Sequence, residues 1–172
     1  GADAILHAAT LHKPHVATHS KKQFIDTNIT GTQNLLDTAI AEGVKSFVFT
    51  STTSTFGHAM TPDCPQTAVW VTEELRPVPK NIYGITKVAA EDFCQLAHQE
   101  KGLNCIVLKT SRFFPEEDDM KHTMTRFSQD NIKAIEFLNR RADIEDVVSA
   151  HDAAMQKAPE IGFDKFIITA TT

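Results

Sequence analysis

The chain is 172 residues long and 41% of its residues are hydrophobic, which is enough for one well-buried domain and hardly for two. Its 22 acidic residues outnumber 17 basic ones, and the net charge of -5 lacks the electrostatic footprint of a protein that binds nucleic acid or an anionic membrane. The sequence has no apolar run of about 18 residues and no signal-peptide pattern at its N-terminus. We therefore expect a single domain over residues 1–172, in a soluble, cytoplasmic protein that acts on a small molecule.

Short apolar runs alternate with segments of helical periodicity. Asp3–Thr10 predicts a strand buried on both faces, and Lys21–Ala41 predicts an amphipathic helix that Gly43 ends. A glycine inside a helix costs about 1 kcal/mol relative to alanine, so Gly31 in the first half of this helix suggests a close approach by backbone or ligand. Val44–Thr50 then predicts a second buried strand.

Three histidines precede the first predicted helix. His12, His15 and His19 are spaced so that they would share one helical face, as the ligands of a metal site do. Pro14 interrupts such a helix, and no carboxylate or cysteine completes the set nearby. A solvent-facing loop is the favoured interpretation, and we predict no metal. The three cysteines are too scattered for a disulfide framework or a paired zinc site, and are expected to be reduced thiols.

The second half of the chain repeats the alternation. Residues 57–80 contain four prolines and little periodicity, which predicts a long ordered loop of the kind that often forms part of an active site. The elements predicted after it are a helix from Ile82 to about Lys101, a strand Asn104–Thr110, a short helix Ile132–Leu138, a helix Asp143–Met155 and a strand Phe163–Ala170. The order strand, helix, strand, helix, strand as far as Thr110 is typical of parallel βαβ units that cross over right-handedly, so we predict an α/β fold with a parallel sheet.

A tyrosine and a lysine stand in the first turns of the predicted helix at residue 82. Tyr83 and Lys87 are four residues apart and therefore share one helical face. A phenol has an unperturbed pKa of about 10, and a fixed cation beside it favours the phenolate, so the pair is capable of proton chemistry. Taken alone, a Tyr-x-x-x-Lys is more often decoration on a helix surface than an acid/base pair.

A run of hydroxyl side chains, Thr50–Thr55, follows the second predicted strand. Parallel sheets bind ligands at the carboxyl ends of their strands, so one of these hydroxyls is a candidate for contact with a substrate. The same composition is a common loop-forming signal, and taken alone it favours a plain loop.

Four motifs occur in a fixed order along the chain: His7-Ala8-Ala9, then Asn28-Ile29-Thr30-Gly31-Thr32, then Phe49-Thr50-Ser51-Thr52 through Phe56-Gly57, then Tyr83-Gly84-Ile85-Thr86-Lys87. Together they resemble the NAD(P)-dependent epimerase/dehydratase family, the extended branch of the short-chain dehydrogenase/reductase superfamily. The first is similar to the family's strand-end cofactor turn, the second to its Asn-x-x-Gly-Thr helix, the third to its active-site strand and the fourth to its catalytic Tyr-x-x-x-Lys. The segment Arg140–His151 is similar to a later part of the family.

The resemblance implies a Rossmann-like, three-layer α/β fold with a parallel sheet, and NAD or NADP as the cofactor. It implies Tyr83 as general acid/base, Lys87 as the group that lowers the pKa of Tyr83 and holds the nicotinamide ribose, and Thr52 as the hydroxyl that hydrogen-bonds the reacting oxygen. The implied substrate is a sugar nucleotide or a related hydroxyl or carbonyl compound. The implied cofactor-binding residues are Ala8, Ala9, Asn28, Thr50, Ser51, Tyr83, Lys87 and Phe113.

The chain departs from the family's pattern in two places. The Gly-x-x-Gly-x-x-Gly turn that seats a pyrophosphate is absent, so we expect an incomplete fold without the first strands. The stretch between Phe114 and the Arg140 segment is short, so we expect most of the substrate lobe to be missing as well. Two interpretations follow. In one, the chain is part of an enzyme whose activity requires the missing half. In the other, it is a catalytically inactive family member that serves as a binding or oligomerisation module, with its exposed first strand pairing with a further chain or a second copy.

Overall fold

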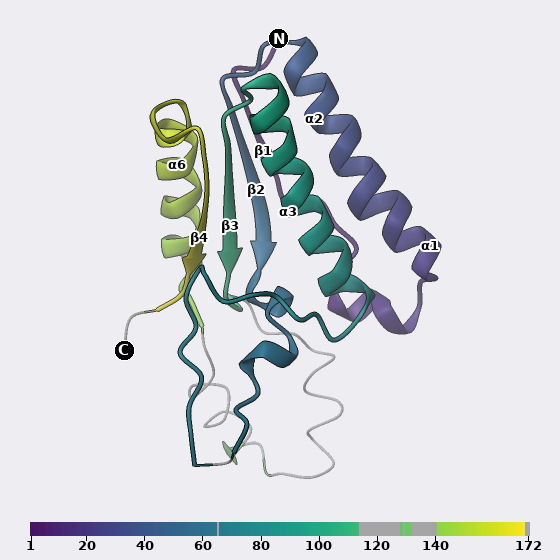
Figure 1. Cartoon of the computed structure of the whole chain (residues 1–172), viewed down its shortest axis with the longest axis vertical. Helices are drawn as coiled ribbons and strands as arrows, with labels where there is room; N and C mark the ends of the chain where they lie inside the picture. The colour runs from purple at the N-terminus through teal and green to yellow at the C-terminus, as the bar shows by residue number, and fades with distance from the viewer. Residues whose placement is uncertain (65, 114–127, 129, 132–140, 171–172) are drawn as a thin grey trace.

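The computed structural model describes residues 1–64, 66–113, 128, 130–131 and 141–170. Its described strands form one parallel sheet in the spatial order β1-β2-β3-β4 (Figure 1). The strands are β1 (Ala4–His7), β2 (Ser46–Thr52), β3 (Cys105–Thr110) and β4 (Phe163–Ile168). The two central strands are apolar along most of their length because helices cover both of their faces. The predicted parallel α/β sheet is therefore confirmed.

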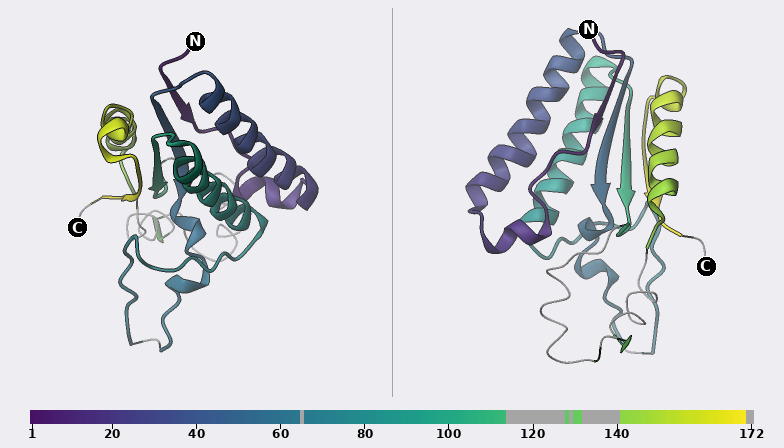
Figure 2. Two further views of the ribbon diagram at one scale, coloured as in Figure 1. Left: turned by 45° about the horizontal axis from the view of Figure 1, so that its top comes forward. Right: turned by 180° about the vertical axis from the view of Figure 1, so that it is seen from behind.

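Helices form the two outer layers. The segment predicted as one helix is helical throughout, as α1 (Lys21–Phe24), a π-helical stretch (Ile25–Thr30) and α2 (Gly31–Ala41). It lies beside α3 (Ile82–Lys101) on one face of the sheet, and α6 (Ile144–Ile161) covers the other face (Figures 1 and 2). Each outer layer has its own apolar core against the sheet.

Alternation along the strands separates these two cores. Phe47 and Phe49 of β2 pack towards α2 and α3, whereas Val48 between them packs towards α6. On β3, Val107 packs on the α3 side and Ile106 on the α6 side. The result is a three-layer, Rossmann-like arrangement.

The crossovers do not all have the same hand. The chain advances across the sheet in one direction from β1 to β4, with α2 and α3 on one face and α6 on the opposite face. The crossover from β3 to β4 therefore has the opposite hand to the two before it. Right-handed crossovers are strongly preferred in parallel sheets, so this last crossover departs from the general rule.

Capping residues explain why both ends of α3 could be predicted from the sequence. Asn81 accepts a hydrogen bond from the backbone N–H of Gly84 (3.1 Å) and begins α3, and Gly102 ends it in the left-handed region at φ 69°. Helix α6 begins at the cap Asp143 as predicted but continues to Ile161, beyond the expected end at Met155. It passes Pro159, which stands in the last turns, where few intrahelical bonds remain to be lost.

The long loop between β2 and α3 is ordered around two glycines. Gly57 has φ 54°, and a Cβ there would lie 2.1 Å from the carbonyl oxygen of Val78, so glycine is required. Gly84 lets the start of α3 approach Pro79, where a Cβ would lie at 2.9 Å. At Gly31 no backbone approaches closely, because the nearest protein atom to a Cβ would lie at an ordinary 3.8 Å, so of the two expected causes only the approach of a ligand stays a prediction.

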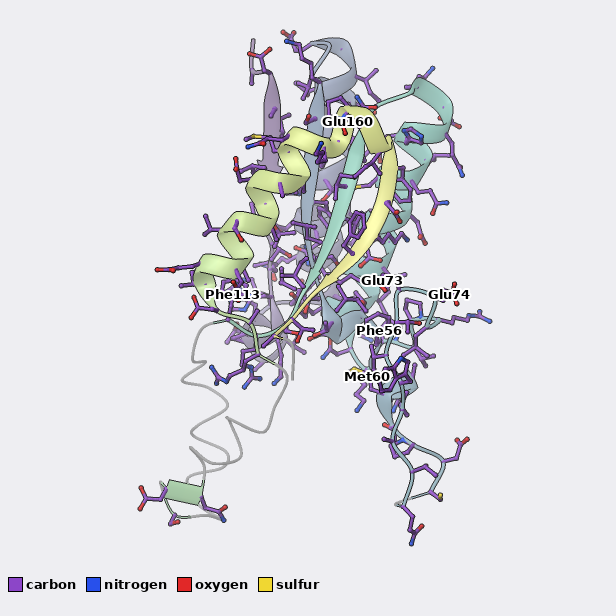
Figure 3. All side chains as sticks on the ribbon, turned by 90° about the vertical axis from the view of Figure 1, so that its left-hand side faces the viewer. Phe56, Met60, Glu73, Glu74, Phe113 and Glu160 are labelled. Carbon is purple, nitrogen blue, oxygen red and sulfur yellow. The ribbon has the colours of Figure 1, made fainter. Side chains whose placement is uncertain are left out.

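A carboxylate on the same loop reaches the outer edge of the sheet. Glu73 lies beside β4, and its Oε1 accepts a hydrogen bond from the backbone N–H of Ile167 at 2.9 Å, whereas Glu74 points away (Figure 3). The predicted helix Ile132–Leu138 lies outside the described residues, as does Arg140. Among the helices of the described ranges, none is long and apolar enough to cross a membrane.

Candidate active site

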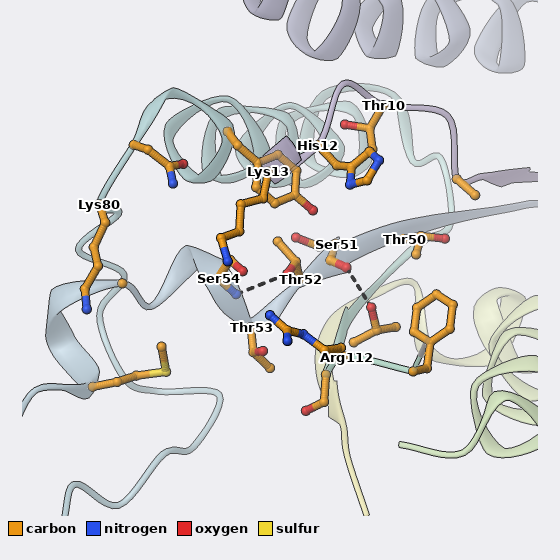
Figure 4. A pocket seen from close by; sticks show the side chains of 18 residues that line it. Thr10, His12, Lys13, Thr50, Ser51, Thr52, Thr53, Ser54, Lys80 and Arg112 are labelled. Atoms are coloured by element: carbon orange, nitrogen blue, oxygen red, sulfur yellow. Dashed lines mark hydrogen bonds between the residues drawn. The ribbon is translucent and has the colours of Figure 1, made fainter. Parts of the chain in front are cut away.

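A cavity of about 520 Å³ lies at the carboxyl ends of the strands (Figure 4). Its wall comes from four segments that are distant in the sequence: the turn after β1, the end of β2 with the turns that follow it, the start of α3, and the segment that follows β3. This volume falls within the range typical of small-molecule sites. The position agrees with the rule that parallel sheets bind ligands at the carboxyl ends of their strands.

The cavity brings together six of the nine predicted site residues. Those that line it are Ala8, Thr50, Ser51, Thr52, Tyr83 and Phe113. Ala9, Asn28 and Lys87 are not part of its wall. Asn28 and Lys87 are buried, with 2% and 1% of their surface exposed, and their contacts with a cofactor stay predictions.

Tyr83 and Thr52 both line the cavity, from the start of α3 and the end of β2. Tyr83 stands in the first turn of α3, which the Asn81 cap fixes, and only 9% of its surface is exposed. Thr52 ends β2, and its Oγ1 accepts a hydrogen bond from the backbone N–H of Ser54 at 3.1 Å (Figure 4). The hydroxyl proton of Thr52 is not used in that bond and remains available for donation.

Lys87 lies behind the end of β2. Its ammonium donates to the carbonyl oxygen of Thr50 at 2.6 Å and lies 3.9 Å from the centre of the Phe49 ring. Burial lowers the pKa of Lys87 to about 7, against the nearby charge of Glu91, which raises it. The lysine therefore holds the backbone of the strand that carries Thr52.

The side chain of Thr50 is held by α6, on the face of the sheet opposite to α3. His151 of α6 contacts the carbonyl oxygen of Val147 through Nδ1 and the hydroxyl of Thr50 through Nε2, both at 2.7 Å. A carbonyl only accepts, so Nδ1 carries a proton, and in the neutral ring Nε2 accepts from the threonine hydroxyl. Thr50 is thus fixed by α3 through its backbone and by α6 through its side chain.

Asn28 organises the turn after β1. Its Oδ1 accepts from the backbone N–H of Leu11 (2.7 Å), and its Nδ2 donates to the carbonyl of Leu11 (2.8 Å) and to the hydroxyl of Thr86 (3.0 Å). The whole amide is used inside the protein. The residue therefore joins the turn to α3, and the contact with a cofactor that the resemblance implies for Asn28 stays a prediction.

His7, in the first motif, is a buried neutral base. The hydroxyl of Thr32 donates to the carbonyl of Asn28 at 2.7 Å, so it accepts at 2.9 Å from Nε2 of His7. Burial, with a smaller contribution from the charge of Lys87, lowers the pKa of His7 to about 4. His7 therefore remains uncharged at neutral pH.

The wall also carries groups that the sequence did not single out. Lys13, Lys80 and Arg112 stand around the cavity, and no aspartate or glutamate belongs to its described lining (Figure 4). Ser111 has a buried hydroxyl oxygen without a hydrogen-bond partner within the described ranges. Ser111 and Arg112 directly follow β3, so the strand-end rule could have identified them.

The histidine cluster does not form a metal site. The rings of His12 and His15 lie 4.6 Å apart and those of His15 and His19 lie 5.0 Å apart. His15 uses Nδ1 to accept from the backbone N–H of His12. These histidines surround a 3₁₀ turn at Lys13–Ala17, and in the part of the chain that the structure describes no group of three His, Cys, Asp or Glu residues is arranged to hold a metal ion.

Comparison with known proteins places the motifs in context. Residues 1–163 match the model of the NAD dependent epimerase/dehydratase family. UDP-glucose 4-epimerase 2 of Oryza sativa is 34% identical over 93 residues, which cover 54% of this chain and 21% of that protein. Uronate dehydrogenase of Agrobacterium fabrum is 28% identical over 174 residues, which cover 95% of this chain and 60% of that protein.

The fold agrees with a solved structure. The crystal structure of UDP-glucuronic acid 4-epimerase from Bacillus cereus in complex with NAD superposes with a TM-score of 0.74 at 20% identity, covering 99% of this chain and 55% of that one. The chain thus spans about half the length of that enzyme, and the Rossmann-like fold is incomplete relative to it. Because the family model covers nearly the whole sequence, the chain belongs to the NAD dependent epimerase/dehydratase family.

Proposed function

We propose that this chain carries the acid/base half of an NAD(P)-dependent epimerase/dehydratase or oxidoreductase that acts on a sugar nucleotide or a related hydroxyl or carbonyl compound. One observation carries the proposal: the phenol of Tyr83 and the hydroxyl of Thr52, from two separate motifs, line the same cavity. Family membership and the sugar-nucleotide epimerases among the similar proteins support the same class of reaction.

In this proposal Tyr83 moves the proton and Thr52 positions the oxygen that gains or loses it. The phenol accepts a proton from a substrate hydroxyl, or returns it to a carbonyl, and such a group typically contributes about 10²–10⁴-fold to the rate. The hydroxyl proton of Thr52 donates to the same oxygen. Lys87 supplies a positive charge one helical turn from Tyr83 and favours the phenolate.

The residues around the cavity suit a nicotinamide nucleotide. When bound, the nicotinamide supplies the hydride acceptor or donor of the reaction. The unpartnered hydroxyl of Ser111, the hydroxyls of Thr10 and Thr50, and the absence of acidic side chains from the described wall fit a polar, anionic ligand. Ala8 and Phe113 offer apolar surface for its ring. Whether NAD or NADP is preferred depends on segments outside these motifs.

A turnover assay tests the proposal. The chain is incubated with NAD or NADP and, in parallel, with UDP-glucose, UDP-glucuronate and free uronate, and both reduction of the nucleotide and epimerised product are measured. We expect turnover with one of these pairs and its loss in Tyr83→Phe, with cofactor affinity nearly unchanged because only the proton carrier is removed. Wild-type turnover in Tyr83→Phe would refute the role of Tyr83. Cofactor binding without turnover on any substrate would favour the alternative of a catalytically inactive module.

A further inference from the structure

A buried carboxylate lies directly behind the cavity. Glu91 of α3 is 1% exposed, and it is the residue one turn beyond Lys87. Its Oε1 accepts a short hydrogen bond from the hydroxyl of Ser51 on β2, and its Oε2 accepts from the ammonium of Lys109 on β3 at 2.6 Å. One side chain thus connects a helix to both central strands.

The same network reaches the turn after β2. Lys109 also donates to the hydroxyl of Thr55 at 3.2 Å, and Thr55 donates to the carbonyl oxygen of Thr52 at 2.8 Å. Ser51 precedes Thr52 and Thr55 follows it, so Thr52 is held from both sides. The carbonyl of Ser51 is held as well, because Thr110 donates to it at 3.1 Å.

Stability alone is a poor reason for this arrangement. The desolvation of a buried ion pair often offsets its Coulombic gain, and apolar replacements of similar volume are frequently neutral or stabilising. The pair Glu91–Lys109 is 1% and 2% exposed, so this reasoning applies to it. An apolar pair would supply neither an acceptor for the Ser51 hydroxyl nor a donor to the Thr55 hydroxyl.

Further charged groups surround Glu91. Lys165 of β4 lies 3.7 Å from its Oε2 and 3.5 Å from Asp92, which is two-thirds exposed. On α3 itself, the charge of Glu91 partly offsets the lowering of the Lys87 pKa by burial. The pKa of Cys94 is raised mainly by its hydrogen bond with Cys105 and by burial, with a smaller contribution from Glu91.

From the side of β1, the buried His7 faces Lys87. His7 is neutral over most of the pH range in which Lys87 titrates, because the pKa of His7 is about 4. Glu91 is therefore the negative charge that acts on Lys87 from within the core.

We propose that Glu91 is a positioning residue for the reaction proposed above: by holding Ser51 and Lys109 with one carboxylate, it fixes the strand end that presents Thr52 and keeps a negative charge beside Lys87. The proposal rests on the proposed function for its catalytic consequence. Its structural part, the fixed strand end and the charge beside Lys87, does not require turnover and is measured without it.

Glu91→Gln is the first test. An amide supplies one acceptor oxygen where the carboxylate supplies two, so either Ser51 or Lys109 loses its acceptor, and the negative charge is lost. The side-chain amine of Lys87 is titrated by NMR in lysine labelled with ¹⁵N, with Lys87→Met to assign its signal. We expect Lys87 to titrate at lower pH by about one unit, the size of effect that a neighbouring opposite charge has. Asp92→Asn makes the same charge change at the adjacent, exposed position and should leave the titration of Lys87 unchanged.

Glu91→Leu/Lys109→Met is the second test and covers the case in which Glu91→Gln does not fold. The double variant leaves no buried charge of the pair without its partner, so we expect it to fold. It removes the carboxylate that binds Ser51 and the ammonium that binds Thr55. We expect the backbone N–H of Ser54, which bonds to Thr52, to exchange faster with solvent, and kcat to fall by about 10- to 100-fold with KM for the cofactor unchanged.

The outcomes separate this proposal from the proposed function. An unmoved Lys87 titration in folded Glu91→Gln would overturn it, as would parental Ser54 protection in the folded double variant. Parental kcat in that double variant would contradict its catalytic part. If the parent chain shows no turnover, the proposed function fails, while the Lys87 titration and the Ser54 exchange still decide whether Glu91 sets the strand end and the charge beside Lys87.

Discussion

Replacing Lys87 by methionine should stabilise the folded chain in mild acid while removing its activity. Burial lowers the pKa of Lys87 from 10.5 to about 7, so carrying the ammonium in the folded state costs on the order of 5 kcal/mol at about 1.36 kcal/mol per pKa unit. Methionine has a similar length and no charge. It forfeits the hydrogen bond to the carbonyl of Thr50, and leaving that oxygen unpaired costs about 1–3 kcal/mol.

The sign of the effect depends on pH. Because the folded pKa lies below the unfolded one, the unfolded chain binds more protons between pH 7 and 10.5, and stability rises with pH across that window. Below pH 7 the full penalty applies to the parent, so Lys87→Met should be more stable there by about 2–4 kcal/mol. Near pH 10.5 the penalty is gone, and the variant should be less stable by about 1–3 kcal/mol.

Urea denaturation of parent and variant at pH 6 and near pH 10.5 measures this reversal. Lys157→Met is the matched control, because Lys157 is exposed and pairs only weakly with Glu160, so its free energy of unfolding should change by less than about 0.5 kcal/mol at either pH. A Lys87→Met variant that is less stable than the parent by the same amount at both pH values would refute the reasoning, since Lys87 would then carry no desolvation penalty.

Two further predictions concern stability away from the cavity. The folded pKa of His7, about 4, lies below its unfolded value of 6.5, so stability should fall as the pH drops through that window, and His7→Gln should flatten this dependence in urea titrations. Gly57→Ala should destabilise the chain more than Gly43→Ala, because both positions have positive φ but only at Gly57 would the new Cβ meet backbone, at 2.1 Å from a carbonyl oxygen. Equal losses in thermal unfolding would contradict the packing argument.

Local signals in the sequence predicted the framework well. Helix α3 was placed correctly at both ends because Asn81 and Gly102 are caps whose function does not depend on distant residues. Helix α6 ran past its predicted end because Pro159 in the last turns costs few hydrogen bonds, which a pattern of apolar residues does not reveal. The hand of the last crossover depends on how α6 packs, and no local signal specifies it.

The sequence predicted the residues whose side chains line the cavity better than it predicted those that hold the surrounding backbone. Thr52 and Tyr83 line the same cavity, whereas Asn28 and Lys87 bind backbone and are not part of its wall. That difference depends on side-chain direction, which sequence spacing alone does not set. Glu91 was not singled out from the sequence: it follows Lys87 by one turn, but its burial depends on Ser51 and on the facing strands.

Calorimetric titration of the chain with NAD and NADP tests the central claim most directly. Fluorescence of Trp70 is a poor substitute, because that residue is 87% exposed and outside the wall of the cavity. We predict heat of binding that saturates below millimolar nucleotide, with affinity retained in Tyr83→Phe. No binding up to millimolar concentrations of either nucleotide would contradict the claim that this chain holds a nicotinamide cofactor at the Tyr83–Thr52 cavity.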